Sequence, residues 1–240
     1  MQRPRTRPRS VRIQRAPWKE IELMKTKTTH DMISASLEVL VFDCDGVLFD
    51  SRKANTRFYS GILEHLGKPP VRPDQEEYIH MHPVRESLQY LLQCPNLFRE
   101  AWKYLENFNF SSFNQYLHKE PGLEELLQLA KGSMRIAMAT NRTVSTRELL
   151  VHFDLDMFFD LVVCASDVEK PKPHPEIMER ILHSFSVTPE KVLFIGDSPV
   201  DEELAWSTGV FFAAYKNPRL KAHLHLNHFE DLKPIIANGK

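Results

Sequence analysis

The 240-residue chain has little cysteine, almost no net charge and no long apolar run, and each shortage excludes a class of protein. Its three cysteines include no C-x-x-C pair and cannot all pair with one another, which is typical of a reduced, cytoplasmic protein rather than a disulfide-stabilised secreted one. The formal net charge of −1 provides no overall field that would attract nucleic acid. No apolar run approaches the length that crosses a bilayer, so we expect neither a membrane nor a nucleic acid as partner.

The first fifteen residues differ from the rest because they carry six arginines, two prolines and no acid. Two functional interpretations are a nucleic-acid arm and a transit peptide, but the prolines would break the amphipathic helix that a transit peptide forms. A basic, proline-rich segment buries too little apolar surface to fold by itself. We therefore predict that residues 1–36 form a basic, disordered tail.

Four short apolar runs are each followed by polar residues that can carry chemistry. The runs, at residues 39–42, 135–139, 161–164 and 192–195, are typical of buried parallel strands. The polar residues that follow them are, in chain order, Asp43, Asp45, Thr140, Asn141, Lys172, Asp197 and Asp201. In an open α/β sheet, ligands bind at the carboxyl ends of the strands, so these residues form the candidate site. Paired acids such as Asp43 and Asp45 bind a divalent cation or share proton-transfer work.

The order of the predicted elements indicates how the chain is divided. After residue 119, strand-like and helical segments alternate, which predicts an α/β fold with a doubly wound parallel sheet. Between residues 52 and 118 the apolar residues follow helical spacing instead, and we predict helices over 55–66, 83–93, 96–108 and 110–117. The prediction is therefore a core made of residues 37–51 and 119–240, with an inserted helical domain at 52–118.

The pattern Asp-x-Asp-Gly-Val-Leu-x-Asp-Ser at residues 43–51 resembles the nucleophile motif of the haloacid dehalogenase (HAD) superfamily. Three later segments, at 140–141, 169–175 and 196–201, resemble the hydroxyl, lysine and acidic motifs of that family, in the family's order. The helical insert resembles the cap of a subgroup that includes phosphoglycolate phosphatases and β-phosphoglucomutases. The resemblance implies a Rossmann-like HAD core with an all-helical cap.

The resemblance also implies roles for the acids. Asp43 would be the nucleophile, because a carboxylate is anionic at neutral pH and needs no base to activate it, and its attack on phosphorus would give an aspartyl-phosphate. Asp45 would be the general acid and base. Asp43, the backbone carbonyl of Asp45, and Asp197 would hold Mg²⁺, which offsets the repulsion between a carboxylate and a phosphate. Asp201 would orient a metal-bound water.

The remaining roles concern the phosphoryl group and the substrate. Thr140 Oγ and the backbone amide of Asn141 would hold phosphoryl oxygens, while Lys172 would neutralise the charge on the nucleophile and the phosphoryl group. Arg85 lies in a cap segment, residues 84–88, that resembles the part of the mutase cap facing the substrate, so we predict it as a substrate contact.

We therefore expect a Mg²⁺-dependent, cytoplasmic phosphatase that acts, as a monomer or homodimer, on a small phosphorylated metabolite such as a phosphoglycolate-like compound or a sugar phosphate. One alternative is a β-phosphoglucomutase-type phosphomutase, whose cap would favour a sugar hydroxyl over water as the acceptor. Another is a non-catalytic HAD-fold binding protein that uses the arginine-rich arm. That alternative predicts the loss of a key acid, and none is lost.

Two further groups invite a functional interpretation that we do not favour. Cys44 stands between two acids, but the alternation of a strand would direct its side chain into the core. His223, His225 and His228 could form a soft-metal site, but we expect a surface cluster because metal sites also need supporting contacts around their ligands.

Overall fold

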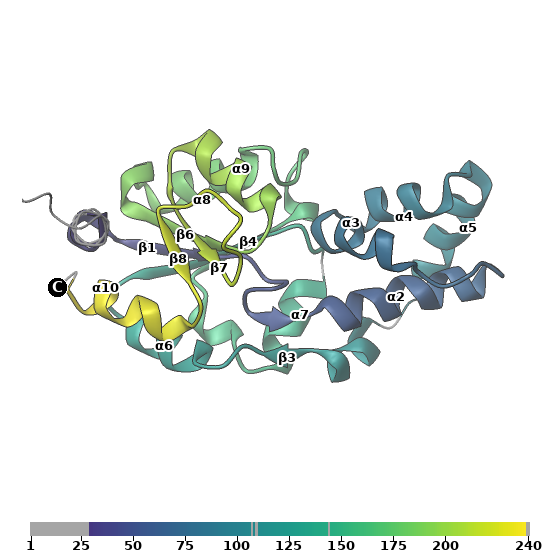
Figure 1. The fold of residues 1–240 in the computed structure, drawn as a ribbon, viewed down its shortest axis with the longest axis horizontal. Helices are drawn as coiled ribbons and strands as arrows, with labels where there is room; N and C mark the ends of the chain where they lie inside the picture. Colours follow the sequence, from purple (N-terminus) through teal and green to yellow (C-terminus); the bar gives the residue numbers. More distant parts are fainter. Residues whose placement is uncertain (1–28, 107, 109, 144, 239–240) are drawn as a thin grey trace, which may run out of the picture.

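The computed structural model describes residues 29–106, 108, 110–143 and 145–238 (Figure 1). At its centre is a six-stranded sheet with the order β5-β4-β1-β6-β7-β8, in which all paired neighbours are parallel. The strands are β1 (Val39–Phe42), β4 (Arg135–Thr140), β5 (Leu161–Cys164), β6 (Val192–Gly196), β7 (Phe211–Tyr215) and β8 (Leu224–Leu226). The four runs predicted as strands are all strands, each ending within one residue of its predicted end.

Successive residues of each strand point to opposite sides of the sheet. Both faces are apolar, and helices cover both of them. From β1, Leu40 and Phe42 enter one core cluster, and Val39 and Val41 enter the other. The first cluster lies under α6 (Leu123–Ala130), α7 (Ser145–His152) and α10 (Lys233–Asn238); the second lies under α8 (Glu176–Phe185) and α9 (Pro199–Thr208). This arrangement confirms the predicted doubly wound α/β class.

The cap is inserted directly after the first strand and consists of helices. It contains α2 (Arg52–His65), α3 (Glu76–Met81), α4 (Val84–Leu92), α5 (Pro95–Leu105) and the 3₁₀ helix η2 (Phe110–Tyr116). Phe58, Ile62 and Leu88 belong to a cap cluster that is separate from the two core clusters. The short strands β2 (Phe49–Asp50) and β3 (His118–Lys119) pair antiparallel where the chain leaves and re-enters the core.

Two cap elements differ from the sequence-based prediction. The segment predicted as a helix over 110–117 is the 3₁₀ helix η2, and α3 was not predicted at all. Six residues are too few to establish a helical period against the surrounding polar residues. The other short 3₁₀ helices are η1 (Pro73–Gln75), η3 (Asp156–Phe158), η4 (Ala165–Asp167), η5 (Pro189–Lys191) and η6 (Phe229–Leu232).

The predicted tail is wrong in its last part. Residues 29–36 are helical, and Ile33 is fully buried in the core cluster that also contains Leu40. The basic composition of the first fifteen residues does not extend this far, so an apolar side chain is available here to pack. The rest of the predicted tail, residues 1–28, lies outside the described residues.

Cys44 and two of the three C-terminal histidines make contacts within the fold. Cys44 is fully buried in the core, as predicted. The ring of His223 accepts a hydrogen bond from the Phe212 amide, and Nε2 of His225 lies 3.0 Å from the Leu220 carbonyl oxygen. Within the described part of the chain, no helix combines the length and the apolarity needed to cross a membrane.

The packing of residues 29–36 leads to a stability prediction. Ile33→Ala should lower the free energy of unfolding by about 2–5 kcal/mol, because it leaves a cavity in a packed core. The matched control is Met32→Ala, whose side chain is 66% exposed and should change stability by less than about 0.5 kcal/mol. Urea denaturation of the two variants measures the difference, and equal values would show that this helix does not contribute to the core.

Candidate active site

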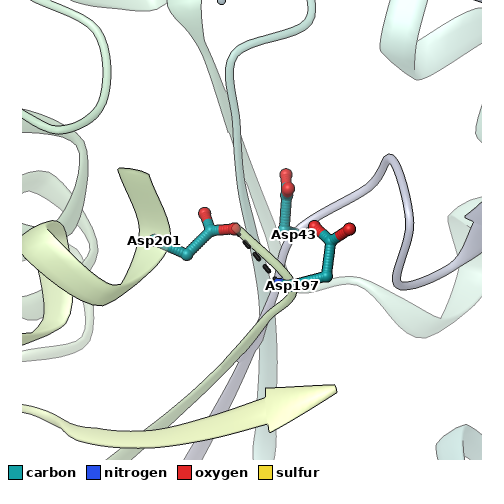
Figure 2. Close-up of side chains that lie close together, drawn as sticks. All are labelled: Asp43, Asp197 and Asp201. Atoms are coloured by element: carbon teal, nitrogen blue, oxygen red, sulfur yellow. Dashed lines mark hydrogen bonds between the residues drawn. The ribbon is translucent and has the colours of Figure 1, made fainter. Parts of the chain in front are cut away.

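The polar residues singled out in the sequence meet at the carboxyl edge of the sheet. Asp43 follows β1, Thr140 ends β4 and Asp197 follows β6, and the strand order places β1 between the other two. Asp201 comes from the first turn of α9 and Lys172 from the loop between η4 and α8. Oxygen atoms of Asp43, Asp197 and Asp201 lie within 4.8 Å of one another (Figure 2).

Lys172 lies between two of these carboxylates. Its Nζ is 2.9 Å from Oδ1 of Asp43 and 2.7 Å from Oδ1 of Asp201, and the three side chains are almost completely buried. Burial raises the pKa of Asp43 from its ordinary value of 3.8 to about 7, although the charge of Lys172 opposes this shift. Burial would lower the pKa of Lys172, but the charges of Asp201 and Asp43 outweigh it and raise that pKa. The lysine is therefore protonated at neutral pH.

Asp201 is fully occupied by contacts with the protein. Its Oδ2 accepts hydrogen bonds from the amide of Ser198 at 3.1 Å and from the hydroxyl of Ser198 at 2.6 Å, and Ser198 in turn caps α9. A Cβ on Gly196 would lie 2.4 Å from that of Asp201, so only glycine allows this close approach. Asp201 therefore orients its neighbours, while Asp43 and Asp197 line the cavity described below.

The acids fit a hard divalent cation such as Mg²⁺. Burial and the nearby charge of Asp201 raise the pKa of Asp197 as well as that of Asp43. The ionised forms of these two carboxylates are therefore disfavoured by their surroundings, and a bound cation would stabilise them. Gly46, with φ of +78°, turns the chain so closely over Asp197 that a Cβ would lie 2.1 Å from its Oδ2. Oxygen ligands of this type are those that Mg²⁺ prefers. Asp43 and Asp197 are the carboxylates available to hold it, and the backbone carbonyl of Asp45 is the third predicted ligand.

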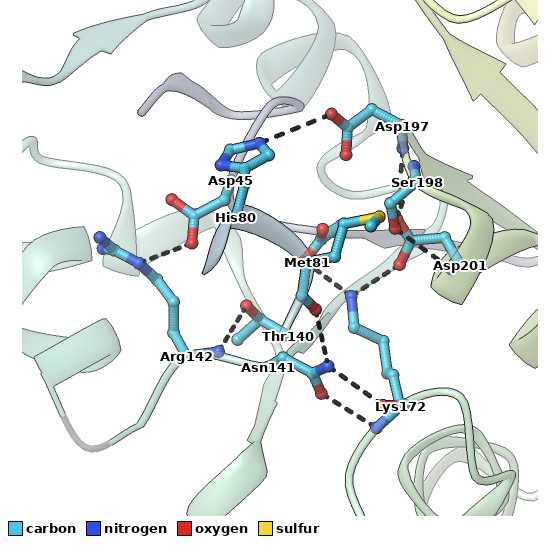
Figure 3. A network of polar contacts seen from close by, with 11 residues as sticks. Asp45, His80, Met81, Thr140, Asn141, Arg142, Lys172, Asp197, Ser198 and Asp201 are labelled. Atoms are coloured by element: carbon cyan, nitrogen blue, oxygen red, sulfur yellow. Dashed lines mark hydrogen bonds and ion pairs between the residues drawn. The ribbon is translucent and has the colours of Figure 1, made fainter. Parts of the chain in front are cut away.

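Asp45 forms an ion pair that the sequence did not reveal. Its Oδ2 accepts a hydrogen bond of 2.9 Å from Nε of Arg142, and both side chains are largely buried (Figure 3). Burial would raise the pKa of Asp45, but the charges of Arg142 and His80 outweigh it and lower that pKa. Asp45 is therefore ionised in this conformation. The position of Arg142 directly after Thr140-Asn141 was the available signal for its role.

Thr140 and Asn141 connect the strand end to its surroundings. Oγ1 of Thr140 accepts a hydrogen bond from the Arg142 amide at 3.1 Å. The Asn141 side chain accepts from the Lys172 amide at 2.9 Å and donates to the carbonyl oxygens of Lys172 and Met81. The Asn141 side chain thus holds both the loop that carries Lys172 and the cap helix α3 (Figure 3).

The cap also brings His80 into the site. Nδ1 of His80 lies 3.1 Å from Nδ2 of Asn55, and Nε2 lies 3.8 Å from Oδ2 of Asp197, which is beyond hydrogen-bond distance. The His80 side chain is 5% exposed, and its Nε2 has no hydrogen-bond partner among the described residues. Burial would lower the pKa of His80, but the nearby Asp197 and Asp45 outweigh it and raise that pKa.

Arg85 does not lie where we predicted. Its guanidinium carbon is 5.1 Å from the ring centre of Trp102 and 5.9 Å from that of Phe98, and Arg85 does not line the cavity. The aromatic rings of α5 attract the cation and hold it within the cap. In this structure Arg85 therefore makes no contact with the cavity, whereas Val84 of the same segment lines it.

A cavity of about 350 Å³ lies between the cap and the core. Its volume is that of a small-molecule site. Of the predicted site residues, it is lined by Asp43, Asp45, Thr140, Asn141, Lys172 and Asp197. The carboxylates of Asp43, Asp45 and Asp197 and the ammonium group of Lys172 therefore share one cavity.

Comparisons with known proteins agree with this geometry. A family model described as haloacid dehalogenase-like hydrolase matches residues 40–215. The chain is 34% identical over 184 residues to a phosphorylated carbohydrates phosphatase of Thermotoga maritima, covering 72% of this chain and 82% of that protein. It is 29% identical to the pyrophosphatase PpaX of Bacillus cereus, covering 84% and 97%. A solved HAD-superfamily hydrolase, subfamily IA, of Geobacter sulfurreducens is 34% identical with a TM-score of 0.70, covering 84% and 97%.

The raised pKa of Asp43 predicts a pH dependence of stability in the metal-free protein. Because the folded-state value of about 7 lies above the ordinary 3.8, the stabilising contribution is fully present below pH 3.8 and is lost as the pH rises through 7. The free energy of unfolding should therefore fall over this range by more in the parent than in Asp43→Asn. Urea denaturation in EDTA at several pH values measures the slopes. The control, Asp50→Asn at an exposed position, should keep the parental slope.

Proposed function

The chain belongs to the haloacid dehalogenase-like hydrolase family, and from that premise we propose that it is a Mg²⁺-dependent phosphatase acting on a small phosphorylated metabolite. The observation that carries the proposal is the buried Lys172 between Asp43 and Asp201, with Asp197 and Asp45 beside them. The names of the Thermotoga and Bacillus relatives, a phosphatase and a pyrophosphatase, support phosphoryl transfer to water. Sugar phosphates and phosphoglycolate-like compounds are the substrate candidates that the family resemblance suggests.

Asp43 is the nucleophile in this proposal. Its carboxylate attacks phosphorus, the bond from phosphorus to the leaving-group oxygen breaks, and an aspartyl-phosphate forms. Lys172 supports this step because its ammonium group is already in contact with Oδ1 of Asp43 and can offset the negative charges of the carboxylate and of the phosphoryl group brought together there. Mg²⁺, held by Asp43, Asp197 and the carbonyl of Asp45, would supply positive charge that lowers the repulsion between the nucleophile and the phosphate.

Asp45 carries the proton in both halves of the reaction. It gives a proton to the departing oxygen and later takes one from the water that hydrolyses the aspartyl-phosphate. The ion pair with Arg142 favours the ionised form, which is the form required for the second half. Asp45 must therefore separate from Arg142 when it acts as the acid. Thr140 Oγ and the Asn141 amide bind phosphoryl oxygens.

The cap and the compartment complete the proposal. Closing the cap over the cavity would keep bulk water away while Asp43 attacks phosphorus. The three cysteines are free, and two of them, Cys44 and Cys164, are buried, which supports a reducing compartment such as the cytoplasm. No feature of the described site favours the phosphomutase alternative, since Arg85 contacts aromatic rings of the cap instead of the cavity.

The decisive variant is Asp43→Asn. The parent should release p-nitrophenolate from p-nitrophenyl phosphate only when Mg²⁺ is present, and Asp43→Asn should lose at least about a thousandfold in kcat, because the nucleophile is removed. Asp50→Asn is the matched control, since the same change at an exposed position nearby should leave kcat unchanged. Full activity of Asp43→Asn, or of the parent in EDTA, would contradict the proposal.

A further inference from the structure

Much of the cavity away from the carboxylates is apolar, and both domains contribute to it. The cap supplies Phe58, Ile79, Phe113 and Leu117, and α7 of the core supplies Leu149 and Val151. The rings of Phe58 and Phe113 meet edge to face with centroids 5.9 Å apart, so this wall is packed and shaped. Hydroxyl groups that lay against these six side chains would find no partner there, and each such loss is costly. The polar side chains of the lining, such as Tyr59, Asn114 and Thr143, are not part of this wall.

The lysine and the arginine that line the cavity already form ion pairs within the protein. They are Lys172 and Arg142, and each is paired with an aspartate of the site. Two further carboxylates in the lining, those of Asp197 and Glu148, add negative charge, and the remaining basic side chains there are His80, His82 and His152. A leaving group with its own carboxylate or phosphate would therefore enter an acidic cavity in which neither Lys172 nor Arg142 is free to pair with it.

One buried nitrogen of the lining, Nε2 of His80, has no hydrogen-bond partner among the described residues. Nδ2 of Asn55 can only donate, so Nδ1 of His80 accepts and Nε2 carries the hydrogen in the neutral ring. An oxygen acceptor of the bound substrate would satisfy this Nε2–H.

On the basis of the proposed phosphatase activity, we propose that the cavity selects phosphomonoesters whose leaving group is uncharged and carries an apolar portion. The apolar wall binds that portion, and His80 Nε2–H donates to an oxygen of the same group. Phosphoglycolate-like substrates are disfavoured by charge, and sugar phosphates by the cost of burying their hydroxyls against Phe113 and its neighbours.

Three esters of primary alcohols test this selectivity at matched leaving-group chemistry: benzyl phosphate, glucose 6-phosphate and phosphoglycolate. With the full chain and Mg²⁺, kcat/KM for benzyl phosphate should exceed that for each of the others by at least about tenfold, since discrimination is measured by this ratio. A value for phosphoglycolate or glucose 6-phosphate that equals or exceeds the benzyl value would overturn this inference alone. Release of phosphate from none of the three would overturn the proposed function as well.

A pair of charge variants tests the electrostatic part. Val151→Arg places a cation at the exposed edge of the cavity wall, and Met157→Arg places one at a similarly exposed position outside the lining; their side chains are 59% and 64% exposed. Val151→Arg should raise the ratio of kcat/KM for phosphoglycolate to that for benzyl phosphate about five- to tenfold, and Met157→Arg should leave it unchanged. An unchanged ratio in Val151→Arg, or an equal rise in both variants, would contradict the inference.

Discussion

The contact on which the site depends is the buried ammonium group of Lys172 between Asp43 and Asp201. Two carboxylates this close and this buried would repel each other, and a single cation in contact with both makes the arrangement possible. The same contact joins three distant parts of the chain: the end of β1, the loop before α8, and the first turn of α9. Removing Lys172 or one of the two aspartates would leave a buried charge with fewer partners. The positions of these three side chains therefore depend on their mutual attraction.

The cap is coupled to this centre through the short helix α3. Met81 of α3 accepts a hydrogen bond from Asn141, which also holds the backbone of Lys172, and His80 of the same helix reaches toward Asp197. Six residues therefore carry two contacts from the cap to the core. A movement of the cap changes the surroundings of the carboxylates directly, which is how a lid can control both the entry of substrate and the exclusion of water.

The chemistry and the selectivity reside in different parts of the cavity. The residues proposed to act on phosphorus come from the carboxyl edge of the sheet, whereas the apolar wall comes from the cap and α7. The wall can therefore differ without a change at the proposed nucleophile, and relatives of this chain are named for substrates as different as phosphorylated carbohydrates and pyrophosphate. A fold of this kind fixes a reaction type, and the side chains of the wall choose the substrate.

The strands that carry the site, and the residues at their carboxyl ends, could be predicted from the sequence, because strand periodicity and the residues after each strand are local features. The sequence placed Asp43, Thr140 and Asp197 at or just after strand ends, and the strand order of the folded sheet makes those ends neighbours. Which charges meet depends on packing between distant segments: Arg142 reaches Asp45 across 97 residues of chain, and Arg85 turns to aromatic rings of the cap. Such contacts depend on how separate elements pack, and the attraction between two charges depends on a distance and a degree of burial that no local pattern contains.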